Sequence, residues 1–396
     1  EFRQFESAWY DGERIKLSRD RVDRLGFFTE VRVDTQEVPN APDQVDLNVT
    51  VVEKPTGNIS LGFGYSQSER LSLLAGIQQE NVFGSGNYLG LNVNTSKYNR
   101  QLSLTTTDPY FTPEGISRTV DLYYRTSQPL DTQEGNYKLT TPGMAVRFGV
   151  PFSETDTVYF GAGIEQTKID PGNGMPLAYN DYIANFGDSP TSVPLTVGWG
   201  RDTRDSALVP STGRLQRVNG ELGIAGDTRY AKANYQFQQY IPLSRQYTLA
   251  FNTELGWGKG MGGRPFPLFK NFYGGGLGSV RGFDQGTLGG RSTLVDDASR
   301  TVYIGGSKMA VLNTEVLAPF PGAGNDRTLR LFGFFDIGNV YTEDQKLDAG
   351  ELRASVGVGL SWISPIGPLR LAFAKPLRKK PGDKMQSIQF QIGTAF

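Results

Sequence analysis

The stretch GNISLGFGYS, residues 57–66, alternates large apolar side chains with small or polar ones. The large apolar side chains are those of Ile59, Leu61, Phe63 and Tyr65. Because successive side chains of a β-strand point to opposite faces, this alternation predicts a strand with one strongly apolar face. The stretch is also long, since strands of soluble β-sandwiches usually have about five or six residues.

Segments of the same kind recur through residues 56–396, and a cluster of turn residues follows each. We count about sixteen of them, or about 21 residues for each strand with its connection, which suits a transmembrane β-barrel. A soluble sandwich is the alternative, but its strands would be shorter. Aromatic residues gather near segment ends, in DPYF (108–111) and FKNFY (269–273), as the girdles of a membrane barrel require. In lipid every backbone polar group needs an internal partner, so the predicted sheet closes on itself.

The composition excludes several kinds of site. The chain of 396 residues contains neither Cys nor His, which removes thiolate nucleophiles, histidine catalysis and Cys/His zinc sites. A net charge of −1 gives no general attraction for nucleic acid. No run of about 18 apolar residues is present, which excludes membrane-spanning helices. We find no constellation for catalysis, and predict neither an enzyme nor a cofactor or metal site.

Residues 1–55 differ from the rest of the chain. LSRDRVDRLGFF (17–28) predicts a short helix with Ser18 as N-cap and Gly26 just past its end. VRVDTQEV (31–38) and QVDLNVTVVEK (44–54) predict two strands joined by a turn. We therefore expect a small α+β module that ends near Pro55.

Two further stretches stand out. GGGLGSVRGFDQG (274–286) lacks the glycine spacing of a Walker loop or a dinucleotide fingerprint, and linkers seldom hold an arginine between Val280 and Phe283 so tightly. LRKKPGDK (377–384) is a basic run. We predict a solvated hairpin tip there, with contact to phosphorylated lipid head groups as the alternative.

Four features together resemble the Omp85 superfamily, whose members assemble or transport proteins at outer membranes. VRGF (280–283) is similar to the loop motif of the superfamily, and FFDIG (334–338) to its F-x-D-x-G strand motif. FQIGTAF (390–396) is similar to the C-terminal β-signal of outer-membrane proteins, and residues 24–54 look like the second half of a POTRA domain. The resemblance spans essentially the whole chain, and is strongest to the members that assemble β-barrels.

The resemblance implies where the loop motif lies. In the superfamily this loop folds back into the lumen, and its arginine meets the aspartate of the strand motif. Arg281 then maps onto Asp336, with Glu315 as a second acidic partner, while Gly282 lets the backbone run close to the wall. In strand 331–340 the side-chain parity places Asp336 on the lumen face, and Gly338 leaves room beside it. The alternative is that Arg281 is solvated at a loop tip.

The implied architecture is all-β and transmembrane. Residues 56–396 are expected to form an antiparallel barrel of about sixteen strands, with an inward-folded loop near 274–306. Residues 1–55 are expected to be a partial POTRA domain on the periplasmic side. The chain opens at EFRQFESAW without an initiating Met, which we interpret as an interior cut. We expect these residues to be the remains of the domain's first helix.

The implied function is that of an assembly factor that folds and inserts β-barrel proteins into the bacterial outer membrane without ATP. The barrel would be closed by pairing the first strand, about 57–66, with the last, about 385–396. Gly393 should weaken this seam, and an opened seam would expose a strand edge for an incoming strand. The lipid face of the last strand carries Phe390, Ile392 and Phe396.

The expected partners are unfolded outer-membrane β-barrel substrates, accessory assembly lipoproteins and outer-membrane lipids, with no nucleic acid. Two alternatives stay open. One is another member of the superfamily that passes polypeptides through the lumen, in autotransporter assembly or two-partner secretion. The other is a general porin that admits small solutes.

Overall fold

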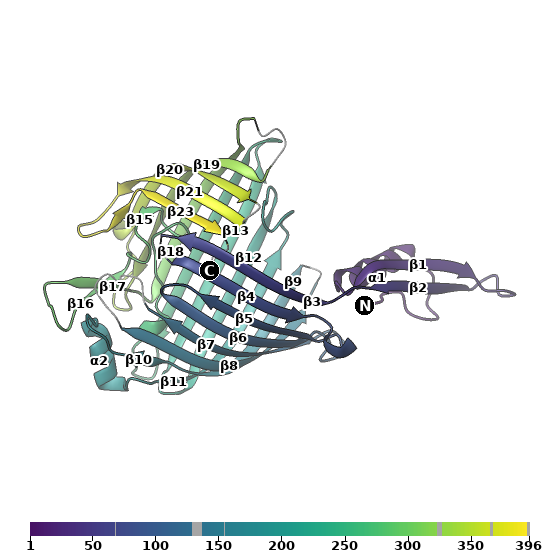
Figure 1. Ribbon diagram of the computed structural model, residues 1–396, viewed down its shortest axis with the longest axis horizontal. Helices are drawn as coiled ribbons and strands as arrows, with labels where there is room; N and C mark the ends of the chain where they lie inside the picture. The colour runs from purple at the N-terminus through teal and green to yellow at the C-terminus, as the bar shows by residue number, and fades with distance from the viewer. Residues whose placement is uncertain (68, 129–136, 154, 323–326, 365–366, 394–396) are drawn as a thin grey trace.

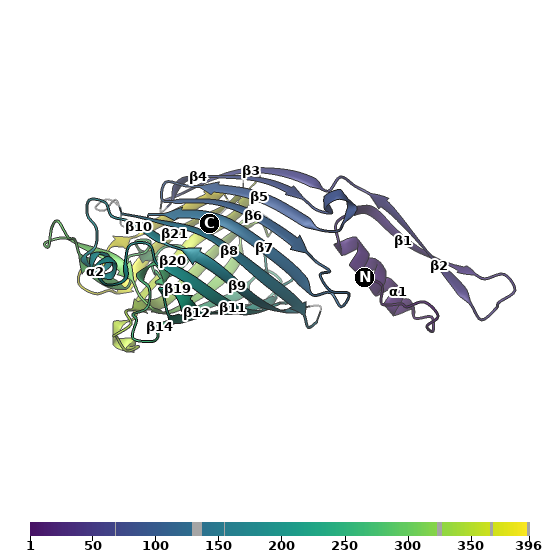
Figure 2. The ribbon, with the colours of Figure 1, turned by 90° about the horizontal axis from the view of Figure 1, so that it is seen from below.

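The structure is a computed structural model that describes residues 1–396 except 68, 129–136, 154, 323–326, 365–366 and 394–396. It consists of a small N-terminal module and a large β-barrel (Figure 1). The module lies beyond one end of the barrel, and the longest connections lie at the other end (Figures 1 and 2). Within the described ranges, no helix is long and apolar enough to cross a membrane.

Sixteen antiparallel strands form the closed barrel in the described residues, as the repeated alternation predicts. Closure comes from pairing of the last strand with the first. The strands are β3 (Gly57–Ser66), β4 (Arg70–Gln79), β5 (Tyr88–Thr95), β6 (Asn99–Asp108), β7 (Ser117–Ser127), β8 (Lys138–Pro151), β9 (Asp156–Gln166), β11 (Thr191–Asp202), β12 (Gly213–Gly226), β13 (Tyr230–Pro242), β14 (Thr248–Gly260), β18 (Lys308–Pro319), β19 (Leu329–Tyr341), β20 (Arg353–Ser364), β21 (Gly367–Arg378) and β23 (Ile388–Gly393).

Shorter elements occupy the connections between barrel strands. They are η1 (Val82–Gly84), β10 (Lys168–Asp170), α2 (Leu177–Phe186), η2 (Leu268–Lys270), β15 (Gly282–Phe283), β16 (Gly290–Thr293), β17 (Thr301–Gly305), η3 (Ala349–Glu351) and β22 (Met385–Gln386). Four of them, η2, β15, β16 and β17, belong to the long connection between β14 and β18, which contains the glycine-rich stretch. Its second half, β16 and β17, forms a separate two-stranded sheet at the barrel end far from the module (Figure 1).

The barrel strands expose their apolar side chains on the outer face. In β3, Ile59 is 74% exposed and Leu61 is 82% exposed, whereas Gly64 is buried. In β19 the parity is equally clear, since Phe332 and Phe334 are buried while Leu331 and Phe335 beside them are exposed. An outward apolar face and a polar lumen are what a barrel in lipid requires.

One aromatic cluster does not lie where the sequence indicated. FKNFY (269–273) was expected in an interface girdle, but it lies inside the barrel. The ring of Phe272 packs against Gly256 of β14, and its centre is 4.5 Å from the Nζ of Lys232 on β13. Tyr110 and Phe111, in the β6–β7 connection, are exposed as a girdle position requires. FKNFY therefore packs against the inner wall through Phe272 and against Tyr182 of α2 through Phe269, instead of lying in a girdle.

The N-terminal module contains α1 (Gly12–Arg24), β1 (Phe28–Glu37) and β2 (Val45–Glu53). The predicted helix is longer than expected and begins at Gly12, with Asp11 as its N-cap, whose carboxylate accepts the backbone N–H groups of Glu13 and Arg14. The N-cap prediction for Ser18 was therefore wrong. The Ser18 hydroxyl lies inside the helix, where it donates to the carbonyl of Arg14 and accepts from the N–H of Arg3. Gly26, with φ +74°, ends the helix as predicted.

Both predicted strands of the module are present and pair with each other. Residues 1–9 contain no helix, so the expectation of a residual first helix was wrong. The reason is local, because the Gln4 side chain donates to the carbonyl of Trp9 and accepts the N–H of Asp11. These two bonds hold the segment in a turn beside the start of α1.

The predicted last strand, 385–396, is divided in the structure. Met385 and Gln386 form β22 and pair with the loop strand β15, while pairing with β21 begins at Ile388. β23 therefore has six residues. Phe396 lies outside the described residues.

Candidate functional site

The glycine-rich stretch turns sharply inside the barrel. Gly275, Gly276 and Gly282 adopt positive φ angles of 97°, 88° and 88°, a region that favours glycine. A Cβ on Gly282 would lie 3.1 Å from the Cβ of Ala374 on β21, so the backbone runs against the wall. The N–H of Gly276 donates to the carbonyl of Phe283 at 3.0 Å and closes the turn. These glycines allow the chain to deliver the side chain of Arg281 to one place.

Arg281 is only 1% exposed and makes three hydrogen bonds to Asp336. Its backbone N–H and its Nε donate to Oδ2 at 3.0 and 2.7 Å, and its Nη2 donates to Oδ1 at 2.6 Å. Asp336 is fully buried in the middle of β19, on the lumen face. The contact expected from the two motifs is therefore present, in the bidentate form that suits a guanidinium and a carboxylate.

A second acid and a second arginine complete the cluster. Nη1 of Arg281 donates to Oε1 of Glu315 on β18 at 2.5 Å, and Arg370 of β21 donates to the same oxygen. Two guanidinium groups thus face two carboxylates, so the enclosed charges balance. Burial by itself would lower the pKa of Arg281, but the bonds to Asp336 and the charge of Glu315 outweigh burial and hold that pKa above its usual value.

Neutral groups position the ion cluster. Asn313 donates to Oδ1 of Asp336 at 2.9 Å and to the carbonyl of Ser279 at 2.6 Å. The Arg281 guanidinium lies over the ring of Phe334, with its Cζ 3.7 Å from the ring centre. A Cβ on Gly338 would lie 3.0 Å from Val280, as the expected need for space predicts. The sequence missed Asn313 and the stacking of Phe334, although strand parity placed Phe334 on the lumen face.

The loop motif is also bonded to the last strand. Gln389 of β23 is 2% exposed and uses both ends of its amide. Its oxygen accepts the N–H of Gly282 at 3.3 Å, and its Nε2 donates to the carbonyl of Phe283 at 2.7 Å. Parity predicted that Gln389 faces inward but not which groups it contacts. VRGF is therefore attached to β18 and β19 by charge and to β23 by a neutral amide.

The seam between the last and first strands is short. In the described part of β23 three residue pairs cross it, Gln391–Ser66, Ile392–Tyr65 and Gly393–Gly64. On its other side β3 pairs with β4 over ten residues. Gly393 has φ +83°, and a Cβ there would lie 2.3 Å from the carbonyl oxygen of Phe63. Glycine is therefore required where the two strands meet.

Aromatic packing supplements the seam on the lipid face. The rings of Phe390 and Tyr65 stack with centres 5.6 Å apart, and the Ile392 side chain is partly exposed beside them. The sequence placed Phe390 and Ile392 on this face. Contact across the seam thus combines a short ladder with one stacked aromatic pair.

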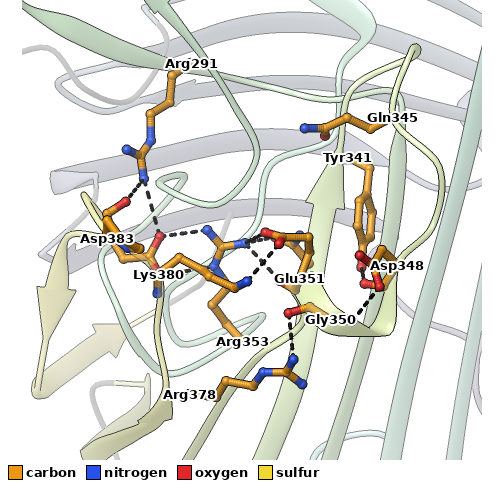
Figure 3. A network of polar contacts seen from close by, with 12 residues as sticks. Arg291, Tyr341, Gln345, Asp348, Gly350, Glu351, Arg353, Arg378, Lys380 and Asp383 are labelled. Atoms are coloured by element: carbon orange, nitrogen blue, oxygen red, sulfur yellow. Dashed lines mark hydrogen bonds and ion pairs between the residues drawn. The ribbon is translucent and has the colours of Figure 1, made fainter.

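A second polar network, centred on Asp383 in the β21–β22 connection, was missed by the sequence. The Asp383 carboxylate accepts from Nε and Nη2 of Arg353 at 3.1 and 2.9 Å, and from the N–H of Lys380 at 2.7 Å (Figure 3). Arg291 of β16 contacts the same carboxylate at 3.4 Å. Asp383 therefore joins the β21–β22 connection, the start of β20 and the hairpin of the long loop.

Neighbouring contacts reinforce this network. Lys380 pairs with Glu351 at 2.8 Å, and Arg378 donates to the carbonyl of Gly350 (Figure 3). The hydroxyl of Tyr303 donates to the carbonyl of Gly382 at 2.6 Å. LRKKPGDK was predicted to be a solvated tip, and much of it is exposed, but the Asp383 side chain is only 1% exposed. A lone acid within a basic run was the available signal.

The other limb of the loop is anchored to the opposite wall. Lys270 of η2 pairs with Glu165 of β9 at 2.5 Å and with Glu221 of β12 at 2.7 Å. Its carbonyl accepts from the Nζ of Lys232 at 2.8 Å. The assignment of FKNFY to a girdle hid this role. Across the described residues, no group of three or more acids or other metal-binding side chains could hold a metal ion.

The barrel of sixteen strands, the arginine loop in its lumen and the α+β module are the combination that the motifs implied. A family model described as "Omp85 superfamily domain" matches residues 81–396, and a POTRA model described as "Surface antigen variable number repeat" matches residues 1–54. The chain therefore belongs to the Omp85 superfamily.

Among curated proteins the chain is similar to outer membrane protein assembly factor BamA. It is 38% identical to BamA of Neisseria meningitidis serogroup B over 100% of this chain and 54% of that protein. It is 30% identical to BamA of Nitratidesulfovibrio vulgaris over 100% of this chain and 49% of that protein. The chain thus spans about half the length of the curated relatives it matches.

Solved structures give the same picture. The crystal structure of BamA from Haemophilus ducreyi lacking POTRA domains 1–3 matches 100% of this chain and 80% of its own, with TM-score 0.87 and 28% identity. CdiB from Acinetobacter baumannii shares the fold, with TM-score 0.59 and 14% identity over 97% of this chain and 68% of its own. The predicted resemblance to the barrel-assembling members is confirmed.

Proposed function

We propose that this chain is the membrane-embedded part of an assembly factor that folds and inserts β-barrel proteins into the bacterial outer membrane. Its similarity to the BamA proteins supports this, and no chemical step is required. In this proposal the barrel lies in the outer membrane and the N-terminal module in the periplasm. Unfolded outer-membrane β-barrel proteins are the substrates, and accessory lipoproteins and outer-membrane lipids are further partners.

The observation that carries the proposal is the short seam between β23 and β3. An unpaired strand edge is a template for another strand, and a closed barrel normally hides every edge. With a net value of about 1 kcal/mol for each hydrogen bond, parting the three residue pairs in the described part of the seam costs a few kcal/mol. Parting β3 from β4 would cost several times more, because ten pairs hold them together. The seam is therefore the favoured place for lateral opening to a substrate strand.

The lumen favours insertion at the seam over passage through the pore. Loop residues held by Arg281 and Lys270 occupy the interior from two sides. A polypeptide-translocating member of the superfamily, or a general porin, would have to move these anchored segments first. Both remain distinguishable alternatives, because the first would require an open lumen during transport and the second would show large, steady single-channel conductance.

A reversible lock on the seam tests the proposal. Tyr65 and Ile392 are paired across it, and the chain has no Cys of its own, so Tyr65→Cys with Ile392→Cys introduces one disulfide. The matched control is Tyr65→Cys with Leu71→Cys, which links β3 to β4 without crossing the seam. Insertion of an unfolded barrel protein into vesicles containing each variant is measured before and after reduction.

We expect the seam disulfide to abolish insertion and reduction to restore it, while the control variant inserts at the normal rate throughout. Normal insertion by the oxidised seam variant would exclude lateral opening. Large, steady conductance that is indifferent to the lock would instead identify a porin.

A further inference from the structure

A cavity of about 570 Å³ opens at the barrel end nearest the N-terminal module. It is lined by residues of the β11–β12 and β13–β14 connections, by the end of β18 and by residues 327 and 330 at the start of β19, which lie at this end because antiparallel strands alternate in direction from β3 onward. Three arginines line it, and its other polar walls are hydroxyl and amide side chains. The arginines are Arg245, Arg327 and Arg330.

Arg330 is the unusual member of this set, because it is 8% exposed and makes no ion pair within the described residues, although the charge of Asp205 acts on it at longer range. Its Nε donates to the carbonyl of Arg327 at 2.7 Å, and its Nη1 donates to the carbonyl of Pro210 at 2.9 Å. In the described part of the chain its Nη2 is buried without a hydrogen-bond partner. A buried guanidinium whose hydrogen bonds go to neutral carbonyls keeps a positive charge that no direct ion pair neutralises, which is costly in a protein interior.

No carboxylate of the described residues neutralises the cavity by an ion pair with its arginines. Arg327 uses its Nη1 on the hydroxyl of Ser211 at 2.8 Å. Asp205 is the acid of the same connection, but its oxygens accept from the N–H and hydroxyl of Ser211 and from the N–H of Thr212. Hydrogen bonds from these donors hold the pKa of Asp205 at about 2 against the opposing effect of burial. Asp205 therefore braces the loop.

The neighbouring ion cluster shows what a satisfied arginine looks like in this barrel. Arg281 and Arg370 share Glu315, and Arg281 also has Asp336. Arg330 lies on the same side of the lumen, and a smaller cavity of about 110 Å³ is lined by Arg330, Arg370 and Glu315. Glu315 is already paired with Arg281 and Arg370. Arg281 and Arg370 are thus paired with acids, whereas Arg330 has no ion pair in the described residues. This contrast indicates that the positive charge of Arg330 in the cavity is available to a ligand.

We propose that this cavity is a binding site for an oxyanion, the carboxylate or phosphate group of a ligand. The free Nη2 of Arg330 provides the buried donor, and Arg327 and Arg245 provide charge at the open side. A guanidinium fork binds either group in bidentate geometry. An acidic stretch of polypeptide and a free or lipid-linked phosphate are the two sources of this chemistry.

Isothermal titration calorimetry on the folded chain in detergent tests the site. The probes are inorganic phosphate and a short end-capped peptide of alternating Glu and Gly. We expect one or both to bind, and Arg330→Gln to weaken binding about tenfold or more, as loss of a charge-assisted hydrogen bond implies. Arg229→Gln, an exposed arginine at the other end of the barrel, is the matched control and should leave binding unchanged.

Arg327→Gln keeps the test sound if Arg330→Gln does not fold, because Arg327 is exposed and its replacement leaves the barrel wall intact. Binding of phosphate alone identifies a phosphate site, and binding of the peptide alone identifies a site for acidic polypeptide. Absence of binding by both probes, or equal binding by the parent chain and the arginine variants, overturns the proposal.

Discussion

Replacing Arg281 with Ala removes the cation that connects the loop to the barrel wall. The substitution deletes two side-chain hydrogen bonds to Asp336 and one to Glu315, and leaves a fully buried carboxylate behind. Removing one partner of a buried ion pair costs about 3–5 kcal/mol. Asp336 keeps the backbone N–H of residue 281 and the amide of Asn313 as donors, so we expect about 3 kcal/mol.

Arg281→Lys separates charge from geometry. An ammonium keeps the charge but lacks the planar fork, and it stacks less well on Phe334. Since a desolvated cation–π contact is worth about 1–2 kcal/mol, we expect Lys to lose roughly half as much stability as Ala. Urea unfolding of the chain in lipid vesicles, followed by fluorescence of its 4 Trp residues, gives the free energies of unfolding.

The exposed Arg229→Ala is the control and should leave the free energy of unfolding unchanged. A double-mutant cycle with Asp336→Ala isolates the pair, and we expect strong coupling because the two side chains share their bonds. A loss below about 1 kcal/mol for Arg281→Ala, with additive effects in the cycle, would refute the argument that this pair holds the loop.

Two further substitutions probe the seam and the outer network. Gly393→Ala places a Cβ 2.3 Å from the carbonyl oxygen of Phe63 at a residue with positive φ, so we expect the seam to separate faster. The measurement is the cross-linking of cysteines at positions 65 and 392, which should become slower. Gly333→Ala, whose Cβ would meet nothing, is the control. Asp383→Asn removes the charge shared by Arg353 and Arg291, so we expect faster trypsin cleavage within residues 378–384. Asp344→Asn, in the neighbouring loop, is the control and should have no effect. Equal cleavage rates for the parent chain and Asp383→Asn would contradict the role of Asp383 in holding this connection.

The barrel could be predicted from the sequence because its signal is local. Alternation such as Ile59, Leu61 and Phe63 sets the face of each side chain, and long strands with many turns indicate closure in lipid. Parity also placed Asp336 and Gln389 in the lumen. The pairing of Arg281 with Asp336 was different in kind, since it came from the resemblance of two short motifs and not from periodicity.

What the sequence missed depends on distant segments meeting. Arg291 and Arg353 lie 92 and 30 positions from Asp383, and no pattern within one segment reports that they share its carboxylate. The helix start was missed for another reason. Asp11 and Ser18 are equally good N-caps by residue type, and only contacts with Arg3 and Arg14 show that the Ser18 hydroxyl is already engaged within the helix.

The amide of Gln389 has a consequence for how this chain itself folds. Its two bonds reach Gly282 and Phe283 across 107 and 106 positions of sequence, and the strand just before it, β22, pairs with the same two loop residues. None of these bonds can form while the loop is outside the lumen. If β23 docked first, its amide would face a water-filled lumen and would gain the bonds to Gly282 and Phe283 only when the loop entered. The loop and the final strand therefore stabilise each other, and we expect these contacts, which join segments more than a hundred positions apart, to form late in folding.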